Sequence, residues 1–366
     1  MELLQIDIEY IAIFIVLAIS FILGLKQRNN VVENTGFLAV DLNMSNAMKG
    51  IACVFVLMGH WKLLAIPAGA HIPWGVSRLV WTFTANIALF WFMFFSGYGL
   101  SKKNYDGVAI GGVWCKRVTK IYLPLLMVCV VMVIIQALLP FKENETYGLE
   151  TFTMLHNICA DNIATILLRS LGWADWYVIC ILYFYSFFYL SLWLSKKMNI
   201  SQTYILFVFL LMYLALAIPL CAYNRAHYYR YCWVFFLGHI VAKWNSIPNK
   251  KTTLFMLAVL ALTLILENGM RTSNIILTDS AYVMAIIMLY VVSAINKRYE
   301  MHGKVMLFLG SISYFFYLSH IRIGFFLIWY VGVLDIMVWV FVSVVIAYIL
   351  NIGYKKILQY VGWGKQ

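Results

Sequence analysis

Charged side chains are scarce in this sequence. Asp, Glu, Lys and Arg make up 11% of its 366 residues, whereas about 25% is usual for a soluble domain. Hydrophobic residues account for 64%, and the mean hydropathy is +0.85. Apolar runs of about 18 residues or more, the length that lets a helix cross a bilayer, recur along the chain. The composition therefore excludes a soluble protein and predicts an all-α, polytopic integral membrane protein, since a helix satisfies its own backbone hydrogen bonds in lipid.

Paired cysteines and acidic side chains are lacking as well. The seven cysteines show no CxxC or other paired spacing, and most lie in or beside apolar runs. They are therefore interpreted as small hydrophobic residues, and no metal site is predicted. Lys and Arg number 27 against 15 Asp and Glu, which gives a net charge of +12. Because the cations gather between the apolar runs, this charge reflects membrane insertion and predicts no nucleic-acid partner.

The apolar runs predict eleven transmembrane helices in one membrane domain that spans residues 1–366. The first run is interpreted as a retained helix rather than a signal peptide, because Glu2, Asp7 and Glu9 stand where a signal peptide has positive charge. The predicted helices are 8–25, 47–66, 79–100, 117–139, 173–195, 203–222, 231–243, 253–267, 280–296, 307–330 and 333–352.

Cations in alternate loops predict the orientation of these helices. The intervening loops are poorer in cations, and the longest of them, 140–172, contains four acidic residues. The positive-inside rule places the cation-rich loops in the cytosol, so the N-terminus is predicted outside and the C-terminus inside. The cation-rich loops contain Lys26 and Arg28; Lys102, Lys103, Lys116 and Arg117; Lys196 and Lys197; Lys243, Lys250 and Lys251; Lys297, Arg298 and Lys304; and Lys355 and Lys356.

Two histidines lie inside predicted helices, where an ionisable group is costly and normally faces the bundle interior or a wet cavity. In the second helix His60 follows Lys49 by eleven residues, which places it about 16 Å further along on nearly the same face. His320 in the tenth helix is predicted at a similar depth, because each histidine lies about 13 residues past the start of its helix. Alternatively, each histidine hydrogen-bonds a neighbouring helix, and Lys49 is an interfacial lysine whose amine reaches the lipid headgroups.

Six stretches of sequence carry a resemblance to a known family. The first is "MKGIACVFVLMGH", in which ten residues separate a basic residue from a histidine. The others are "WFMFFSGYGL", "CKRVTKIYLP", "GWADWYVICILYFY", "YYRYCWVFFLGHIVA" and "GSISYFFYLSH". Together, and in this order, they resemble the motifs of the membrane acyltransferase-3 family, the acyl-CoA-dependent O-acyltransferases of surface glycans. The resemblance covers residues 40–350; because the family core has ten helices, residues 1–30 would form an extra N-terminal transmembrane helix.

The resemblance implies a multi-pass enzyme of the bacterial plasma membrane. It would move an acyl group from cytosolic acyl-CoA to a hydroxyl of a cell-surface or lipid-linked glycan, with acetyl as the first candidate and succinyl as the alternative. The sequence ends at Gln366, soon after its last predicted helix. No fused extracytoplasmic domain is therefore expected, and any such transferase would be a separate partner.

Cations at the predicted inner ends of the second and fourth helices are candidates for the acyl-CoA site, because its nucleotide end is multiply anionic. The alternative for all of them is ordinary positive-inside bias, which we prefer for Lys102 and Lys103. Lysine stands at two candidate positions where the family usually has arginine, which keeps the charge but loses the planar fork that binds phosphate in a bidentate manner. Those two positions are 49 and 120, and the candidates are Lys49, Lys116, Arg117 and Lys120.

His60 is the candidate for the transfer step. It would act as a general base on the acceptor hydroxyl or carry the acyl group itself, with Lys49 near the donor. His320 would orient His60, act as a second base, or line the passage. Ser96 and Gly97 are interpreted first as a small pair that lets two helices pack closely.

Aromatic and charged side chains near the predicted outer face are candidates for the glycan acceptor. Aromatic faces stack on sugars, and cations suit anionic polymers; the alternative is an ordinary interfacial belt of Tyr and Trp. The candidates are Trp176, Tyr177, Asp175, Arg225 and Arg230.

Two other classes of protein fit the same features. One is a transporter or lipid-linked glycan flippase without covalent chemistry, and the other is a regulatory membrane protein that binds acyl-CoA or lipid. The sequence shows no internal repeat and no matched pair of short helices broken by Gly or Pro, which many transporters have. We therefore favour the enzyme.

Overall fold

The computed structural model describes residues 2–29, 38, 40–65, 76–138, 176–220, 227–247, 249–271, 275–327 and 335–360. The chain divides into two compact units. Unit 1 consists of Met1–Phe92 and Asn274–Gln366, and unit 2 consists of Met93–Ser273.

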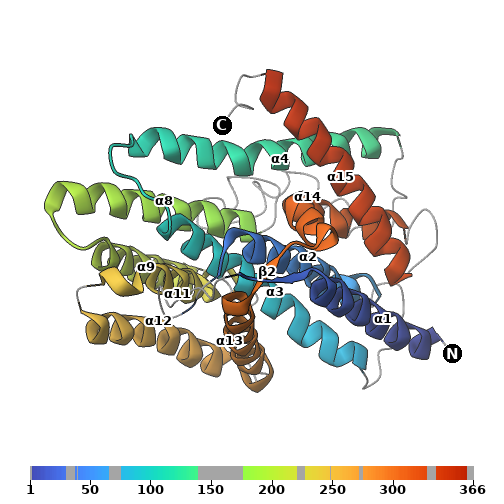
Figure 1. Cartoon of the computed structure of the whole chain (residues 1–366), viewed down its shortest axis with the longest axis horizontal. Helices are drawn as coiled ribbons and strands as arrows, with labels where there is room; N and C mark the ends of the chain where they lie inside the picture. The colour runs from blue at the N-terminus through green and yellow to red at the C-terminus, as the bar shows by residue number, and fades with distance from the viewer. Residues whose placement is uncertain are drawn as a thin grey trace. The chain divides into compact units, whose positions relative to one another are not determined.

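Unit 1 contains the two ends of the chain and the helices that carry both predicted histidines (Figure 1). Helix α3, Val76–Ser101, belongs to it as far as Phe92. Its other elements are α1 (Glu2–Leu23), β1 (Leu25–Gln27), α2 (Leu42–Ala65), α13 (Ile275–Arg298), β2 (Tyr299–Met301), α14 (Lys304–Phe326) and α15 (Ile336–Tyr360).

Unit 2 begins with the last residues of α3, from Met93. Its remaining elements are α4 (Ile110–Leu138), α8 (Trp176–Met198), α9 (Gln202–Leu220), α10 (His227–Arg230), α11 (Cys232–Lys243), a 3-10 turn η2 (Trp244–Ser246) and α12 (Lys250–Arg271).

Within the described residues, each predicted transmembrane segment overlaps a helix, so the prediction of an all-α, polytopic membrane protein is confirmed. Seven helices within the described residues are long and apolar enough to cross a membrane: α2, α3, α8, α9, α13, α14 and α15. By contrast, the 12 residues of α11 rise only about 18 Å, less than the roughly 30 Å of a hydrocarbon core. The number of eleven crossings and the orientation stay predictions.

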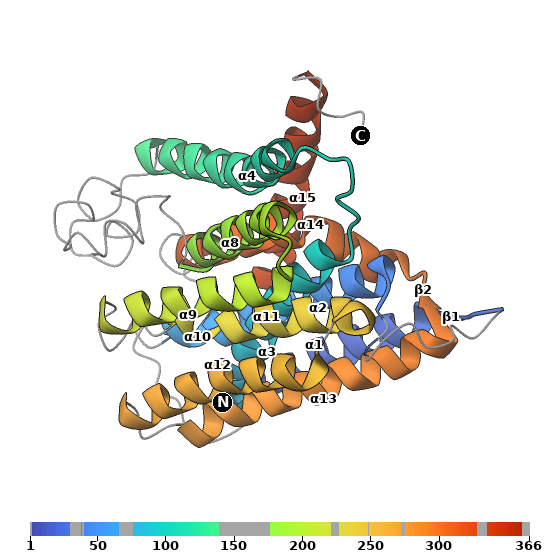
Figure 2. The same ribbon diagram turned by 90° about the vertical axis from the view of Figure 1, so that its left-hand side faces the viewer.

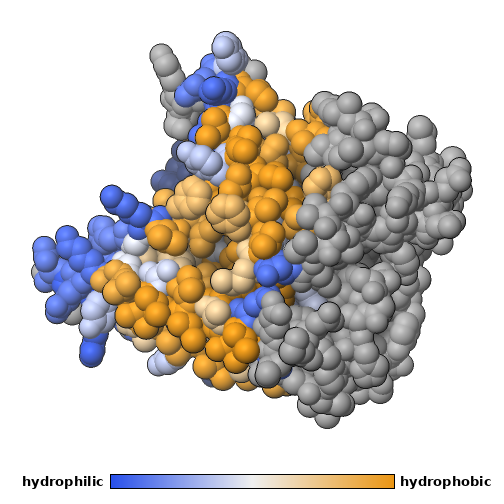
Figure 3. Space-filling model, turned by 90° about the vertical axis from the view of Figure 1, so that its right-hand side faces the viewer, coloured by the Kyte–Doolittle hydropathy of each residue, from blue (hydrophilic) through white to orange (hydrophobic). Residues whose placement is uncertain are grey.

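Apolar side chains cover much of the surface, as expected for helices in lipid. Figure 3 shows one face on which the described side chains are mostly hydrophobic, with hydrophilic ones mainly at its left and upper margins. In unit 1, Ile15 of α1 is 51% exposed and Phe341 of α15 is 68% exposed. Exposed aliphatic and aromatic side chains in such numbers are typical of a surface that contacts a membrane rather than water.

Helix α2 begins five residues before the apolar run that predicted it, at Leu42 instead of residue 47. Asp41 caps this end, since its Oδ1 accepts a hydrogen bond of 2.8 Å from the Met44 N–H. The first turn is polar, with Asn43, Ser45 and Asn46. Hydropathy alone therefore placed the start too late.

A two-stranded ribbon in unit 1 was not predicted. β1 and β2 pair antiparallel, with Leu25 opposite Met301 and Gln27 opposite Tyr299 (Figure 2). The N–H groups of His302 and Gly303 both donate to the Gly24 carbonyl, at 2.8 and 3.1 Å. The ribbon therefore joins the end of α1 to the end of α13.

Candidate active site

Helices α2 and α14 pack backbone to backbone through two glycines. A Cβ atom on Gly310 would lie 2.2 Å from the Asn46 carbonyl oxygen, and one on Gly50 would lie 2.8 Å from the Gly310 nitrogen. Only glycine permits this approach, because any larger residue would push the helices apart. The contact sets the register of the two helices about three turns before the histidines.

The two predicted histidines meet ten residues beyond this contact on each helix. His60 follows Gly50 and His320 follows Gly310 by the same interval, about 15 Å along each axis. Nδ1 of His60 and Nε2 of His320 are 2.8 Å apart, and the two rings are inclined by only 5°. Equal spacing from a shared contact shows that α2 and α14 run parallel, and it explains why the two rings lie at the same level.

The hydrogen bonds around the pair determine which ring nitrogens carry protons. Nδ1 of His320 lies 2.7 Å from the Tyr317 carbonyl oxygen and 3.1 Å from that of Phe316. Carbonyl oxygens only accept, so this Nδ1 carries the proton and the His320 Nε2 has a lone pair. The His60 Nδ1–H then donates to that lone pair. The remaining nitrogen, Nε2 of His60, is left as an unprotonated base.

The two rings differ sharply in their surroundings. The His320 side chain is fully buried, with Phe316 stacked at a centroid distance of 6.0 Å and Trp339 of α15 at 6.3 Å. The Trp339 Nε1–H also donates to the His320 carbonyl oxygen at 2.7 Å. His60 is only partly buried. His320 is therefore enclosed by its neighbours, and His60 is the more exposed member of the pair.

Lys49 lies on α2 beside Gly50 and is partly exposed. It precedes His60 by eleven residues in one continuous helix, about 16 Å along the axis. The Lys49 amine and the His60 ring are therefore about three turns apart on one helix.

The donor-site candidates Arg117 and Lys120 lie near a third cation in unit 2. The pKa of Lys103 lies below its usual value. The main cause is the positive charge of nearby Arg117, and burial and the charge of Lys120 contribute less. Lys103 and Lys120 are exposed, and Arg117 is partly exposed. We call these three residues the cation cluster. From the sequence, Lys103 was attributed to the positive-inside bias of cytosolic loops. Its place in the cluster could not be predicted, because it is the loop between α3 and α4 that brings Lys103 close to Arg117.

The other two cations near the cluster differ from its members. The Lys102 amine lies over the Tyr98 ring at 5.4 Å, so it packs against its own helix. Lys116 is exposed and precedes Arg117 on α4, a turn of about 100° away from it.

Two tyrosines of unit 2 lie close enough to Arg117 for its positive charge to act on their hydroxyl groups. Burial raises the pKa of the Tyr105 hydroxyl, and Arg117 acts in the opposite sense. The Tyr185 hydroxyl of α8 also interacts electrostatically with Arg117, and it lies within hydrogen-bonding distance of Ser96. The sequence motifs pointed to neither tyrosine.

Gly97 and Gly238 let α3 and α11 cross at close range. A Cβ atom on Gly97 would lie 2.1 Å from the Phe235 carbonyl oxygen, and one on Gly238 would lie 2.2 Å from that of Phe94. The interpretation of Gly97 as a close-packing residue is therefore confirmed.

A third buried histidine, His239 of α11, was not singled out in the sequence. The Ser101 hydroxyl donates to the Gly97 carbonyl at 2.8 Å, so the His239 Nδ1–H donates to the Ser101 oxygen at 2.8 Å. Its Nε2 then accepts from the Thr203 hydroxyl at 3.0 Å. His239 is 1% exposed. Both of its nitrogens are used in joining α3, α9 and α11, which is a structural arrangement.

Three of the five acceptor candidates lie in the described part of the chain. Trp176 begins α8 and stacks on Tyr231 with centroids 5.8 Å apart, so one face of its indole is covered. Tyr177 is buried, and Arg230 is partly buried at the end of α10. Asp175 and Arg225 lie outside the described residues.

Among the residues that the structure describes, no three His, Cys, Asp or Glu side chains gather as a metal site requires. Four cysteines whose side chains the structure describes are free thiols: Cys53, Cys180 and Cys232 are buried, and Cys115 is exposed.

Comparison with known proteins gives the family of the chain. No curated protein and no solved structure matches it. The family described as Acyltransferase domain matches residues 43–353, which include α2 with His60, α14 with His320 and the cation cluster. Helix α1 lies before the matched residues. Because this match covers most of the sequence and agrees with the six motifs, the chain belongs to the acyltransferase-3 family of membrane acyltransferases.

Proposed function

We propose that this protein transfers an acyl group, with acetyl as the first candidate, from cytosolic acyl-CoA to a hydroxyl of a cell-surface or lipid-linked glycan. The family supplies the reaction class. The observation that carries the proposal for this chain is the 2.8 Å contact between His60 and His320, which leaves Nε2 of His60 as a base on a partly exposed ring.

In the direct route, His60 Nε2 takes the proton of the acceptor hydroxyl while the hydroxyl oxygen attacks the thioester carbonyl. A carbon–oxygen bond forms, the carbon–sulfur bond breaks, and the CoA thiolate leaves and receives the proton. In the alternative route the same nitrogen attacks the thioester first, and the acyl group passes from His60 to the acceptor. Both routes need Nε2 unprotonated at the start.

His320 supports either route as a positioning residue. Its Nε2 accepts the His60 Nδ1–H at 2.8 Å, which fixes the tautomer and ring orientation of His60 in the way that a carboxylate does in a catalytic triad. The bond also stabilises the positive charge that develops on His60 as Nε2 gains a proton or an acyl group.

The cation cluster is proposed to bind the phosphates of the donor, together with Lys116. Lys49 of unit 1 is proposed, as a separate residue, to interact with the donor. The lowered pKa of Lys103 supports this role, because cations close enough to repel one another are stabilised by a multiply charged anion. With the cation-rich loops in the cytosol, the cluster would face the compartment that contains acyl-CoA.

The acceptor is proposed to bind at the other face of the membrane. Trp176 and Tyr177 would line the glycan site, with Asp175, Arg225 and Arg230 as polar partners. Trp176 is partly exposed, which supports a role in stacking on a sugar. A separate extracytoplasmic transferase would complete delivery if the first acceptor is an intermediate. We place the enzyme in the bacterial plasma membrane.

The test is acyl transfer by membranes that contain this chain. Membranes are supplied with radiolabelled acetyl-CoA, and label is followed into the glycan fraction. We expect label in the glycan with the native chain, loss of that label with His60→Ala, and full label with His302→Ala, which replaces an exposed histidine outside the pair. A transporter would give no label dependent on this chain, and a His60→Ala variant that transfers at the native rate would contradict the proposal.

A further inference from the structure

An apolar groove lies in unit 1, away from the histidine pair and bounded by α1, α2, α3 and α13. Phe14 and Ala18 of α1 form one wall, Val291 and Ile295 of α13 form another, and Trp91 of α3 closes it. The cavity measures about 380 Å³, and its lining is almost entirely apolar. An apolar lining forms no hydrogen bonds with water, so the groove is suited to binding an apolar chain.

Helix α1 is fixed in place along this groove. Its Tyr10 hydroxyl donates to the Met58 carbonyl at 3.1 Å, and Phe14 meets Phe55 edge to face at 5.5 Å. Glu9 accepts the Ile336 N–H at 3.2 Å. The groove is therefore a built feature of unit 1, although α1 lies outside the residues that match the family.

The two groove helices end together at the ribbon. β1 begins two residues after α1 ends, and β2 follows α13 directly. The Arg28 N–H donates to the Arg298 carbonyl at 2.9 Å, and the Arg28 guanidinium binds the Asp41 carboxylate and the Asn296 carbonyl. Arg28 is thus occupied within the protein, and the ribbon follows the ends of the two groove helices α1 and α13.

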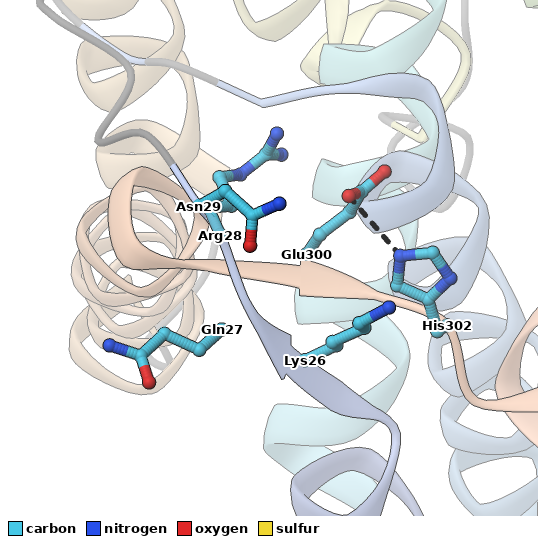
Figure 4. Close-up of a pocket in the computed structure, with 6 residues that line it drawn as sticks. All are labelled: Lys26, Gln27, Arg28, Asn29, Glu300 and His302. Atoms are coloured by element: carbon cyan, nitrogen blue, oxygen red, sulfur yellow. Dashed lines mark ion pairs between the residues drawn. The ribbon is translucent and has the colours of Figure 1, made fainter.

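Exposed cations stand at this end. Arg298 follows the groove residues Val291 and Ile295 by seven and three positions on α13, so it continues their stripe on the helix. Lys26 of β1 is also exposed. Glu300 lies on the same side of the ribbon as Lys26 (Figure 4). Its carboxylate is 3.2 Å from the His302 ring.

We propose that the groove binds a membrane phospholipid with an anionic headgroup, one acyl chain lying between α1 and α13 and the phosphate contacting Arg298 and Lys26. An apolar channel whose α13 wall continues to Arg298, with Lys26 on the adjoining strand β1, is complementary to an amphiphile of this kind and to neither a free anion nor a neutral chain. Basic sites between transmembrane helices bind anionic lipids of the cytoplasmic leaflet, where the predicted orientation places this ribbon. The proposal does not depend on the acyl-transfer reaction.

Native mass spectrometry of the purified full-length protein tests the proposal. The protein is equilibrated with equal amounts of dioleoyl phosphatidylglycerol and dioleoyl phosphatidylcholine. We expect one retained phosphatidylglycerol and no comparable retention of phosphatidylcholine. Replacing both cations, Lys26→Gln with Arg298→Gln, lowers this retention about tenfold or more, because each cation near an anionic headgroup contributes measurably. Lys355→Gln with Lys356→Gln, which removes two exposed cations of α15, leaves it unchanged.

Three further results separate the lipid from other occupants. Ala18→Phe fills the groove and lowers retention of phosphatidylglycerol even with both cations present, whereas soluble glycerophosphoglycerol does not displace the lipid. Equal retention of the two lipids, or native retention in the double cation variant, would overturn the proposal. So would a second copy of the chain in the groove, shown as a dimer that Ala18→Phe dissociates.

Discussion

His60 and His239 both lie in helices of a membrane protein, and both are hydrogen-bonded, but their surroundings give them different capacities. His239 is 1% exposed, and hydroxyl groups of Ser101 and Thr203 use both of its ring nitrogens. His60 is partly exposed and, within the described part of the chain, is held through Nδ1 by His320. A histidine with both nitrogens satisfied in a dry interior joins helices. One that is held by a single nitrogen on an accessible ring is oriented for chemistry.

The largest expected effect separates the two histidines by rate. His60→Ala should lower the rate of acyl transfer by at least about 100-fold, the usual contribution of a general base. Its melting temperature should fall less than that of His239→Ala, because the His60 ring is only partly buried and the one group that loses its partner is Nε2 of His320. Steady-state transfer by purified protein and thermal unfolding of the same sample measure the two quantities. A variant with native kcat would show that the exposed nitrogen is idle.

The next effect tests whether His320 acts through His60. His320→Ala should lower kcat by about 100-fold, since a misplaced catalytic group costs that much, while the KM for acyl-CoA changes little. His320→Gln should recover part of the rate, because its amide oxygen can accept the His60 Nδ1–H.

The double variant His60→Ala with His320→Ala sharpens this prediction. It should be no slower than His60→Ala alone, because residues that act as one unit are not additive. Two independent losses that multiply would show that His320 has a separate role.

Arg117 offers an intermediate effect in unit 2. Arg117→Gln should raise the KM for acyl-CoA about tenfold, in line with loss of one charge-assisted hydrogen bond to phosphate, and leave kcat nearly unchanged. The same replacement should raise the pKa of Lys103, because Arg117 is the main cause of its depression. NMR of ¹³C-dimethylated lysines follows that pKa. Donor binding should raise it too, so binding strengthens as the pH falls through the pKa of Lys103. A pKa that stays low in Arg117→Gln would contradict the cluster.

The smallest effect on rate belongs to His239. Replacing His239 with alanine leaves the Ser101 and Thr203 hydroxyls without their partner in a buried site, which costs about 1–3 kcal/mol of folding free energy. We expect a lower melting temperature and nearly native kcat per folded molecule. Loss of kcat with an unchanged melting temperature would erase the distinction between the two histidines.

Much of the fold could be predicted because it depends on apolar length. Runs of hydrophobic residues mark the helices, and equal offsets along two of them were enough to expect His60 and His320 at one level. The 2.8 Å contact between the two histidines could not be predicted from the sequence. It depends on the close approach of the two helices at Gly50 and Gly310, and the role of these glycines is evident only when both backbones are seen.

Other parts of the candidate site left no such signal. The strands of the ribbon are three residues each, too short to show the alternation of polar and apolar residues that is typical of a strand. The cations around them were therefore interpreted as ordinary loop charges. Lys103 and Arg117 lie fourteen positions apart, and their proximity depends on the turn between α3 and α4. His239 looked like part of an apolar motif, since the hydroxyls that satisfy it come from two other helices.

The central claim is that His60 presents an unprotonated Nε2 while its Nδ1–H is held by His320. ¹⁵N NMR of the histidine rings in the purified protein measures it directly, with His60→Ala and His320→Ala used for assignment. We predict that both rings of the pair carry their proton on Nδ1, and that His320→Ala removes the hydrogen-bond shift of the His60 Nδ1 signal. A His60 ring protonated on Nε2, or one unaffected by loss of His320, would contradict the account.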